Sequence, residues 1–107
     1  MPGTRPLLSL PSSNDACAAI GDVFHVGGIV GPAHELTLEE VRAERPRTTF
    51  AAWRMPYSMY LRGPAGTALP QGLYWLSHHS FGRMCLFLVP RSREPVTGAV
   101  RYEAVFD

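Results

Sequence analysis

The chain has 107 residues and contains no lysine, so all ten of its basic residues are arginine. Without a lysine amine, the chain cannot form a Schiff base with a substrate or use an amine as a nucleophile. It also lacks the lysine that completes a phosphate-binding G-x-x-x-x-G-K loop, so we interpret Gly27, Gly28 and Gly31 as turn residues. These absences exclude several classes of enzyme before any motif is considered.

The chain has little net charge, because ten basic residues oppose nine acidic ones and leave a balance of +1. A typical nucleic-acid-binding domain carries a strongly basic face, and this balance does not supply one. Arginines are interleaved with aromatic residues, but we interpret these as core packing and protein contacts. We therefore expect no nucleic-acid partner.

Cysteine is also scarce, with only Cys17 and Cys85 in the chain. Two cysteines do not make a disulfide framework, and the sequence leaves open whether they are bridged. Cys85 lies within an apolar run, residues 84–89, where a cysteine behaves as a small hydrophobic residue. We expect it to be buried and reduced.

Long hydrophobic runs are absent, since none approaches the roughly 20 residues of a membrane helix. The leucines near the start are interrupted by Pro6 and Pro11, unlike the continuous apolar stretch of a signal peptide. We therefore expect a cytoplasmic protein with no membrane partner, unless a larger assembly is exported by other means. Residues 1–13 are expected to form a flexible proline-rich arm, followed by a single β-rich domain over residues 14–107.

Short β-prone segments separated by glycine and proline dominate the rest of the chain. A short helix is expected over residues 14–20, capped by Ser13 or Asn14 and ended by Gly21. The pattern predicts a mainly β fold, a small antiparallel β-barrel or sandwich of about six strands with one short N-terminal helix. The clearest β-prone segments are residues 23–26, 48–53, 57–62, 73–78, 83–89 and 99–106, with a polar loop over residues 90–98.

Residues 34–45 can be interpreted in two ways. Thr37 and Glu40 match a helical capping box, and such a helix would bury mainly Leu38 and Val41. The alternation of Leu36 and Leu38 with polar neighbours instead favours a half-buried strand. Local propensity taken alone favours the helix.

The segment over residues 83–89 is apolar on both faces of a strand. Met84, Leu86 and Leu88 alternate with Cys85, Phe87 and Val89, so each face needs a cover. The N-terminal helix or a second copy of the protein could provide the cover for one face. We predict a protein contact, with self-association as one form of it, through Tyr60, Arg62, Trp75 and Phe87.

The adjacent histidines His78 and His79 are the most suggestive chemical feature. Neighbouring residues on a strand point to opposite faces, so the two could share a metal only within a turn. No zinc-type ligand spacing is present, and we expect neither metal, cofactor nor catalytic residues. The alternative is a small ligand-binding barrel or small enzyme with a pocket near Tyr74, His78 and His79.

The C-terminal half carries several spaced motifs in a fixed order, at residues 60–64, 69–74, 86–90 and 102–106, with His78 and Gly82 between them. In these residues the chain resembles a family of small bacterial β-rich domains of unknown function whose members end in Tyr-Glu-Ala-Val-Phe. The proline-rich start and the His78-His79 pair depart from the family pattern. The family offers no known catalytic residues to carry over.

This resemblance changes two expectations. It implies a strand in place of a helix at Glu35–Glu39, and it implies gene neighbours that resemble phage-tail-collar proteins. We therefore expect a non-enzymatic structural or protein-interaction module. It would be a self-associating or partner-binding component of a larger bacterial, phage-tail-related assembly.

Overall fold

A computed structural model describes residues 11–27, 31, 34–43 and 56–106. Six strands and one short helix are present in these residues, which confirms the predicted fold class. Residues 1–10 of the expected arm over residues 1–13, and the expected strand over residues 48–53, lie outside the described residues. The last residues of the expected arm are described, and Ser12 and Ser13 form the cap and the first residue of the helix. The elements are α1 (Ser13–Ala18), β1 (Val23–Val26), β2 (Glu35–Ala43), β3 (Tyr57–Gly63), β4 (Gly72–His78), β5 (Gly82–Arg93) and β6 (Val100–Phe106).

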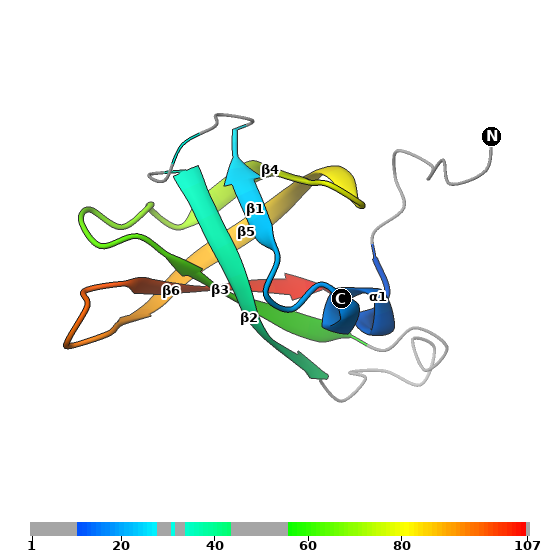
Figure 1. The fold of residues 1–107 in the computed structure, drawn as a ribbon, viewed down its shortest axis with the longest axis horizontal. Helices are drawn as coiled ribbons and strands as arrows, with labels where there is room; N and C mark the ends of the chain where they lie inside the picture. Colours follow the sequence, from blue (N-terminus) through cyan, green and yellow to red (C-terminus); the bar gives the residue numbers. More distant parts are fainter. Residues whose placement is uncertain (1–10, 28–30, 32–33, 44–55, 107) are drawn as a thin grey trace.

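The six strands form a closed barrel in the order β1-β2-β3-β6-β5-β4, and every pairing is antiparallel (Figure 1). Each strand is therefore hydrogen-bonded to two neighbours over part of its length. Closure removes most of the free sheet edge that an open sheet would present.

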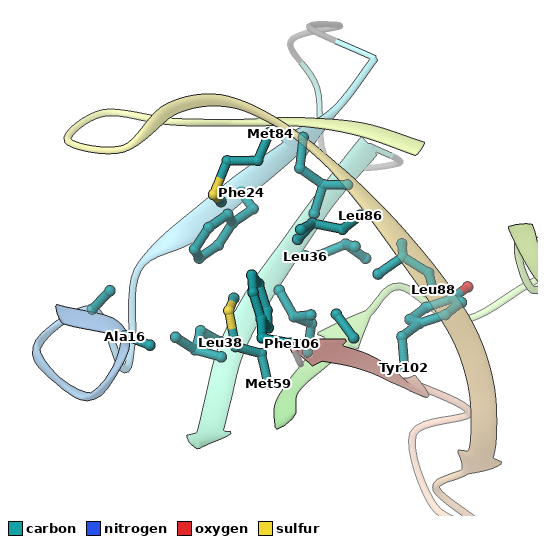
Figure 2. Close-up of a cluster of buried hydrophobic side chains, with 14 of the residues drawn as sticks. Ala16, Phe24, Leu36, Leu38, Met59, Met84, Leu86, Leu88, Tyr102 and Phe106 are labelled. Carbon is teal, nitrogen blue, oxygen red and sulfur yellow. The ribbon is translucent and has the colours of Figure 1, made fainter. Parts of the chain in front are cut away.

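Alternate side chains of each strand point into the barrel and fill it. Figure 2 shows this cluster, with Ala16 of α1 at one end and Leu88 and Tyr102 at the other. The largest fully buried apolar side chains are Phe24, Leu36, Leu38, Met59, Leu61, Leu76 and Leu88. The inside of the barrel is thus a packed core.

The helix α1 lies at one end of the barrel and packs against β2. Its cap is Ser12, which exchanges two hydrogen bonds of 3.2 Å with Asp15 in a capping box. The expectation of a cap at Ser13 or Asn14 was wrong by one or two residues. Ser12, Ser13 and Asn14 follow one another, and each of these residue types can cap a helix. Ala16 and Ala19 join the core, so the helix closes this end of the barrel.

The ambiguous segment forms the strand β2, as the family resemblance implied and against local helix propensity. A register shift between Leu38 and Glu40 marks a β-bulge. The bulge moves Val41 to the inward face, so the strand packs Leu38 and Val41 against the core although they are three residues apart. This spacing had suggested a helix.

The strand β5 continues to Arg93, four residues beyond the predicted end at Val89. Proline cannot donate a ladder hydrogen bond, but Pro90 lies at a second register shift, between Pro90 and Ser92, where this lack is tolerated. No helix in the described part of the chain is long and apolar enough to cross a membrane.

Candidate functional site

The outward faces of β4, β5 and β6 carry a continuous set of exposed apolar residues. Across β4 and β5, Leu73 pairs with Phe87 and Trp75 pairs with Cys85. Leu88 pairs with Ala104, which brings Val105 beside Phe87 on the outward face. The exposed fractions are 69% for Leu73, 52% for Trp75, and 45% for both Phe87 and Val105. We call Leu73, Trp75, Cys85, Phe87 and Val105 the outer apolar patch.

Cys85 is exposed and has no disulfide partner, so the prediction that it is buried was wrong. The apolar run in which it lies alternates between the core and the outside. Met84, Leu86 and Leu88 point inward, so Cys85 points outward beside Trp75. Cys17 is also free and exposed, which answers the open question of a bridge between the two. At the edge of the patch, the Arg83 guanidinium lies 5.0 Å from the centre of the Trp75 ring.

Tyr60 was predicted to share a contact surface with Trp75, and the structure places it in a polar cluster on the outside of β2, β3 and β6. Its ring is contacted by the guanidinium groups of Arg42, at 4.9 Å, and Arg101, at 4.6 Å. Both arginines also form ion pairs with Glu40. These hydrogen bonds from Arg101 and Arg42 lower the pKa of Glu40.

Glu103 forms the centre of this cluster and is nearly buried, with 7% of its surface exposed. Its carboxylate accepts hydrogen bonds from Arg91 at 2.7 Å, Ser58 at 2.9 Å and Tyr60 at 3.3 Å. Burial alone would raise the pKa of Glu103, but the bonds from Arg91 and Ser58 outweigh it and lower the pKa. Glu103, in the terminal motif on β6, therefore connects β6 with β3 and β5. The surroundings of Tyr60 described here are polar and charged.

Arg62, the fourth predicted interaction residue, is exposed and lies on β3, whereas the outer apolar patch lies on β4, β5 and β6. It pairs with Thr37 on one side and Arg101 on the other. It lines two neighbouring hollows of about 280 and 360 Å³ near the β5–β6 loop. Of the four predicted interaction residues, Trp75 and Phe87 thus belong to the outer apolar patch, whereas Tyr60 and Arg62 lie on β3.

His78 and His79 both contact Asp22, which was not among the predicted site residues. Nε2 of His78 lies 2.9 Å from Asp22 Oδ2, and Nε2 of His79 lies 3.1 Å from the same oxygen. His78 ends β4 and His79 follows in the turn, so the two rings need not point to opposite faces. The hydrogen bonds from His78 and His79 lower the pKa of Asp22. No local signal marked Asp22, because 56 residues separate it from His78.

These three residues offer ligand atoms within 4.8 Å of one another, which is compact enough for a metal ion. The second nitrogen of His78 argues against one. His78 Nδ1 accepts hydrogen bonds from the backbone N–H groups of Ser80 and Phe81 at 3.0 and 3.1 Å. The ring proton must then reside on Nε2, where it is donated to Asp22. A metal ligand normally donates its second ring N–H, which is the opposite arrangement.

The exposed side of this cluster borders a hollow of about 250 Å³. Tyr74 does not line it, and its hydroxyl instead donates to the Pro70 carbonyl at 2.6 Å. The alternative pocket predicted from Tyr74, His78 and His79 is therefore only partly assembled. Ser80 Oγ lies 3.0 Å from His79 Nδ1, which gives a chain of hydrogen bonds from Ser80 through His79 to Asp22.

The fold is thus a small closed antiparallel barrel with a filled core and two outward features, an apolar patch and an Asp-His-His cluster. Residues 11–106 match the family described as a domain of unknown function (DUF6916), and the chain belongs to this family. Comparison with curated proteins and with solved structures gives no match.

Proposed function

We propose that the chain is a non-enzymatic protein-interaction module that binds another protein through the outer apolar patch. The observation that carries this proposal is the contiguity of five apolar side chains on three adjacent strands. Scattered exposed apolar residues are ordinary, but a contiguous patch with two aromatic residues is typical of a protein contact.

The mode of contact follows from the closed barrel. Edge pairing with another sheet requires a strand with an unpaired side, and here each strand already has two neighbours over part of its length. The outward face is available over β4, β5 and β6. The proposed contact is therefore between faces, with side chains packed against a partner surface.

The partner assembly is proposed to be bacterial and related to a phage tail. The support is the terminal motif Tyr102–Phe106 and the gene neighbours of the family that the sequence resembles. A structural role in an assembly fits the filled core, because the inward side chains of the strands pack together in one buried cluster.

The test uses the protein encoded beside the gene, which the family resemblance implies to be tail-collar-like; it is purified separately, and calorimetry measures its binding to this chain. Trp75→Ala should weaken binding at least tenfold, because it removes the largest side chain of the patch. The control is Val96→Ala, since Val96 is 91% exposed and lies outside the patch. The proposal is contradicted if the chain neither self-associates nor binds the neighbouring protein. It is also contradicted if Trp75→Ala leaves the binding affinity unchanged.

The Ser80-His79-Asp22 chain favours a second candidate, a weak esterase. In that reaction Ser80 Oγ would attack the ester carbonyl while His79 Nδ1 took the hydroxyl proton. The proton would then pass to the departing alkoxide, and water would hydrolyse the acyl-serine. The nearby N–H groups of Ser80 and Phe81 already bond to His78, so neither can stabilise an oxyanion. Hydrolysis of p-nitrophenyl acetate that is abolished by Ser80→Ala would favour this candidate over the module.

A further inference from the structure

We infer that the partner protein adds an extended segment, as one more β-strand, to residues 83–86 of β5 on the side away from β4. We call this side of residues 83–86 the β5 edge. The inference rests on the proposed function, because the same partner would cover the outer apolar patch. It adds main-chain pairing to the contact between faces.

The β5 edge has no strand beside it in the described part of the chain. The strand β5 pairs with β4 from Gly82 to Leu88, whereas its pairing with β6 begins only at Leu88. Figure 1 shows that β5 reaches its turn with β4, while β6 ends near the C-terminus. The closed ring therefore leaves this stretch of β5 with one neighbour. Such a stretch is a template for pairing with another strand.

The register identifies the backbone groups that face the β5 edge. The Gly27 N–H donates to the Trp75 carbonyl at 2.7 Å, so the backbone groups of Trp75 face β1. Trp75 pairs with Cys85, and in an antiparallel pair of this kind the Cys85 N–H and C=O face away from β4. Those of Arg83, two residues earlier, face the same way, and no described backbone group bonds to either residue there. These N–H and C=O groups are placed to pair with an added strand.

The side chains beside the β5 edge indicate the chemistry of the added segment. Cys85 and Phe87 point outward and belong to the outer apolar patch, so the edge and the patch are continuous. The added residue beside Cys85 would lie in one row with Cys85 and Trp75, so an apolar side chain fits there.

Arg83 argues for a different chain as the source of this segment. Two copies of this chain, paired through their β5 edges, would bring two Arg83 guanidinium groups into one short contact. Like charges in such a contact are unfavourable, and an apolar extended segment of another protein avoids them. The inference therefore assigns the β5 edge to the partner protein.

Amide hydrogen exchange in the free chain tests whether the β5 edge is open. The N–H groups of Arg83 and Cys85 should exchange at least ten times faster than those of Met84 and Leu86, which face β4. NMR resolves the four amides individually. Equal protection of all four would show that the edge is already occupied, and it would overturn the inference.

The same measurement with the partner tests strand addition. The partner is the protein encoded beside the gene, added in excess. Exchange at Arg83 and Cys85 should then slow at least tenfold, because both amides gain an acceptor. Binding that leaves their exchange unchanged would overturn the inference while the proposed function stands. Protection that rises with the concentration of this chain alone would assign the edge to a second copy and would also overturn the inference.

A proline variant separates the edge from the face. Cys85→Pro removes the N–H that faces the edge and leaves the ladder with β4 intact, which is where a strand tolerates proline. Cys85→Ala is the matched control, because it loses the same thiol and keeps the N–H. In calorimetry, Cys85→Pro should bind the partner at least tenfold more weakly than Cys85→Ala, and equal affinities would overturn the inference.

Two further outcomes complete the test. If circular dichroism shows that Cys85→Pro does not fold, amide exchange in the unmodified chain decides. If the unmodified chain does not bind this partner, the inference is refuted, and if it also fails to self-associate, the proposed function is refuted with it.

Discussion

The hydroxyl of Ser58 donates a hydrogen bond of 2.9 Å to the carboxylate of Glu103 across the β3–β6 pair, although both residues point out of the barrel. Ser58 is 1% exposed and Glu103 is 7% exposed. A buried carboxylate is tolerated only when its oxygens are paired, and Arg91 and Tyr60 complete the pairing here. This arrangement gives the glutamate of the terminal motif a structural role.

Glu103→Gln should destabilise the fold by about 1–3 kcal/mol, because the amide loses the charge that strengthens the bonds from Arg91 and Ser58. Urea unfolding measures the loss. Glu94→Gln is the control, since Glu94 is exposed and bonds only locally to Thr97. An equal effect of the two substitutions would contradict a structural role for Glu103.

Acid should weaken the fold through Asp22. The pKa of Asp22 in the folded chain is lowered from its ordinary value of 3.8, so the ionised carboxylate is favoured by folding. Its contribution is fully present above that value and is lost as the pH falls through the lowered pKa. The stability difference between the unmodified chain and Asp22→Asn should shrink as the pH falls below 3.8. Urea midpoints measured across this range check it, and a difference that ignores pH would refute it.

Gly63→Ala should cost about 1–3 kcal/mol through overpacking. A Cβ at Gly63 would lie 2.9 Å from both Leu36 Cδ2 and Tyr102 Cε2. Neither neighbour can yield easily, since both are buried and the Tyr102 hydroxyl is bonded to the Leu69 N–H. Gly72→Ala is the matched control, because a Cβ there meets no atom closer than 3.9 Å. Thermal unfolding compares the two variants. Similar midpoints would contradict the prediction, because they would show that Leu36 and Tyr102 move and relieve the contact.

The fold class was predictable because alternating apolar residues and glycine or proline turns act locally. The strand β1 and the β4–β5 hairpin follow directly from such signals, and Gly82 adopts the positive φ of 74° that its turn requires. The strand β2 was harder, because a bulge changes which residues face the core. A bulge has no clear sequence signal, so the spacing of Leu38 and Val41 resembled a helix.

The candidate site was less predictable because it depends on register. Trp75 and Phe87 were identified as contact residues, and the structure places them on one face. Cys85 was assigned to the core, since an apolar run does not show which of its faces is covered. Tyr60 was predicted to share a contact surface with Trp75, and its arginine neighbours could not be foreseen because they come from β2 and β6. Contacts between strands distant in sequence leave no trace in local pattern.

His78 should be a neutral imidazole protonated at Nε2, because Nδ1 accepts two backbone N–H groups. Nitrogen-15 NMR of the ring distinguishes the tautomers directly. His78→Ala should also raise hydrogen exchange at Ser80 and Phe81, since both amides lose their acceptor. His79→Ala is the control and should leave both amides protected. A ring protonated at Nδ1 would contradict the arrangement and reopen the question of a metal ligand.

The reactivity of Cys85 tests the burial of the outer apolar patch most directly. A Cys17→Ser chain is mixed with a thiol reagent at increasing concentration of the partner protein, with a Cys85→Ser chain in parallel. We predict that the rate constant for Cys85 falls as the partner concentration rises, while that for Cys17 stays constant, because the partner covers the outer apolar patch, to which only Cys85 belongs. Equal and concentration-independent rate constants for the two thiols would contradict the account.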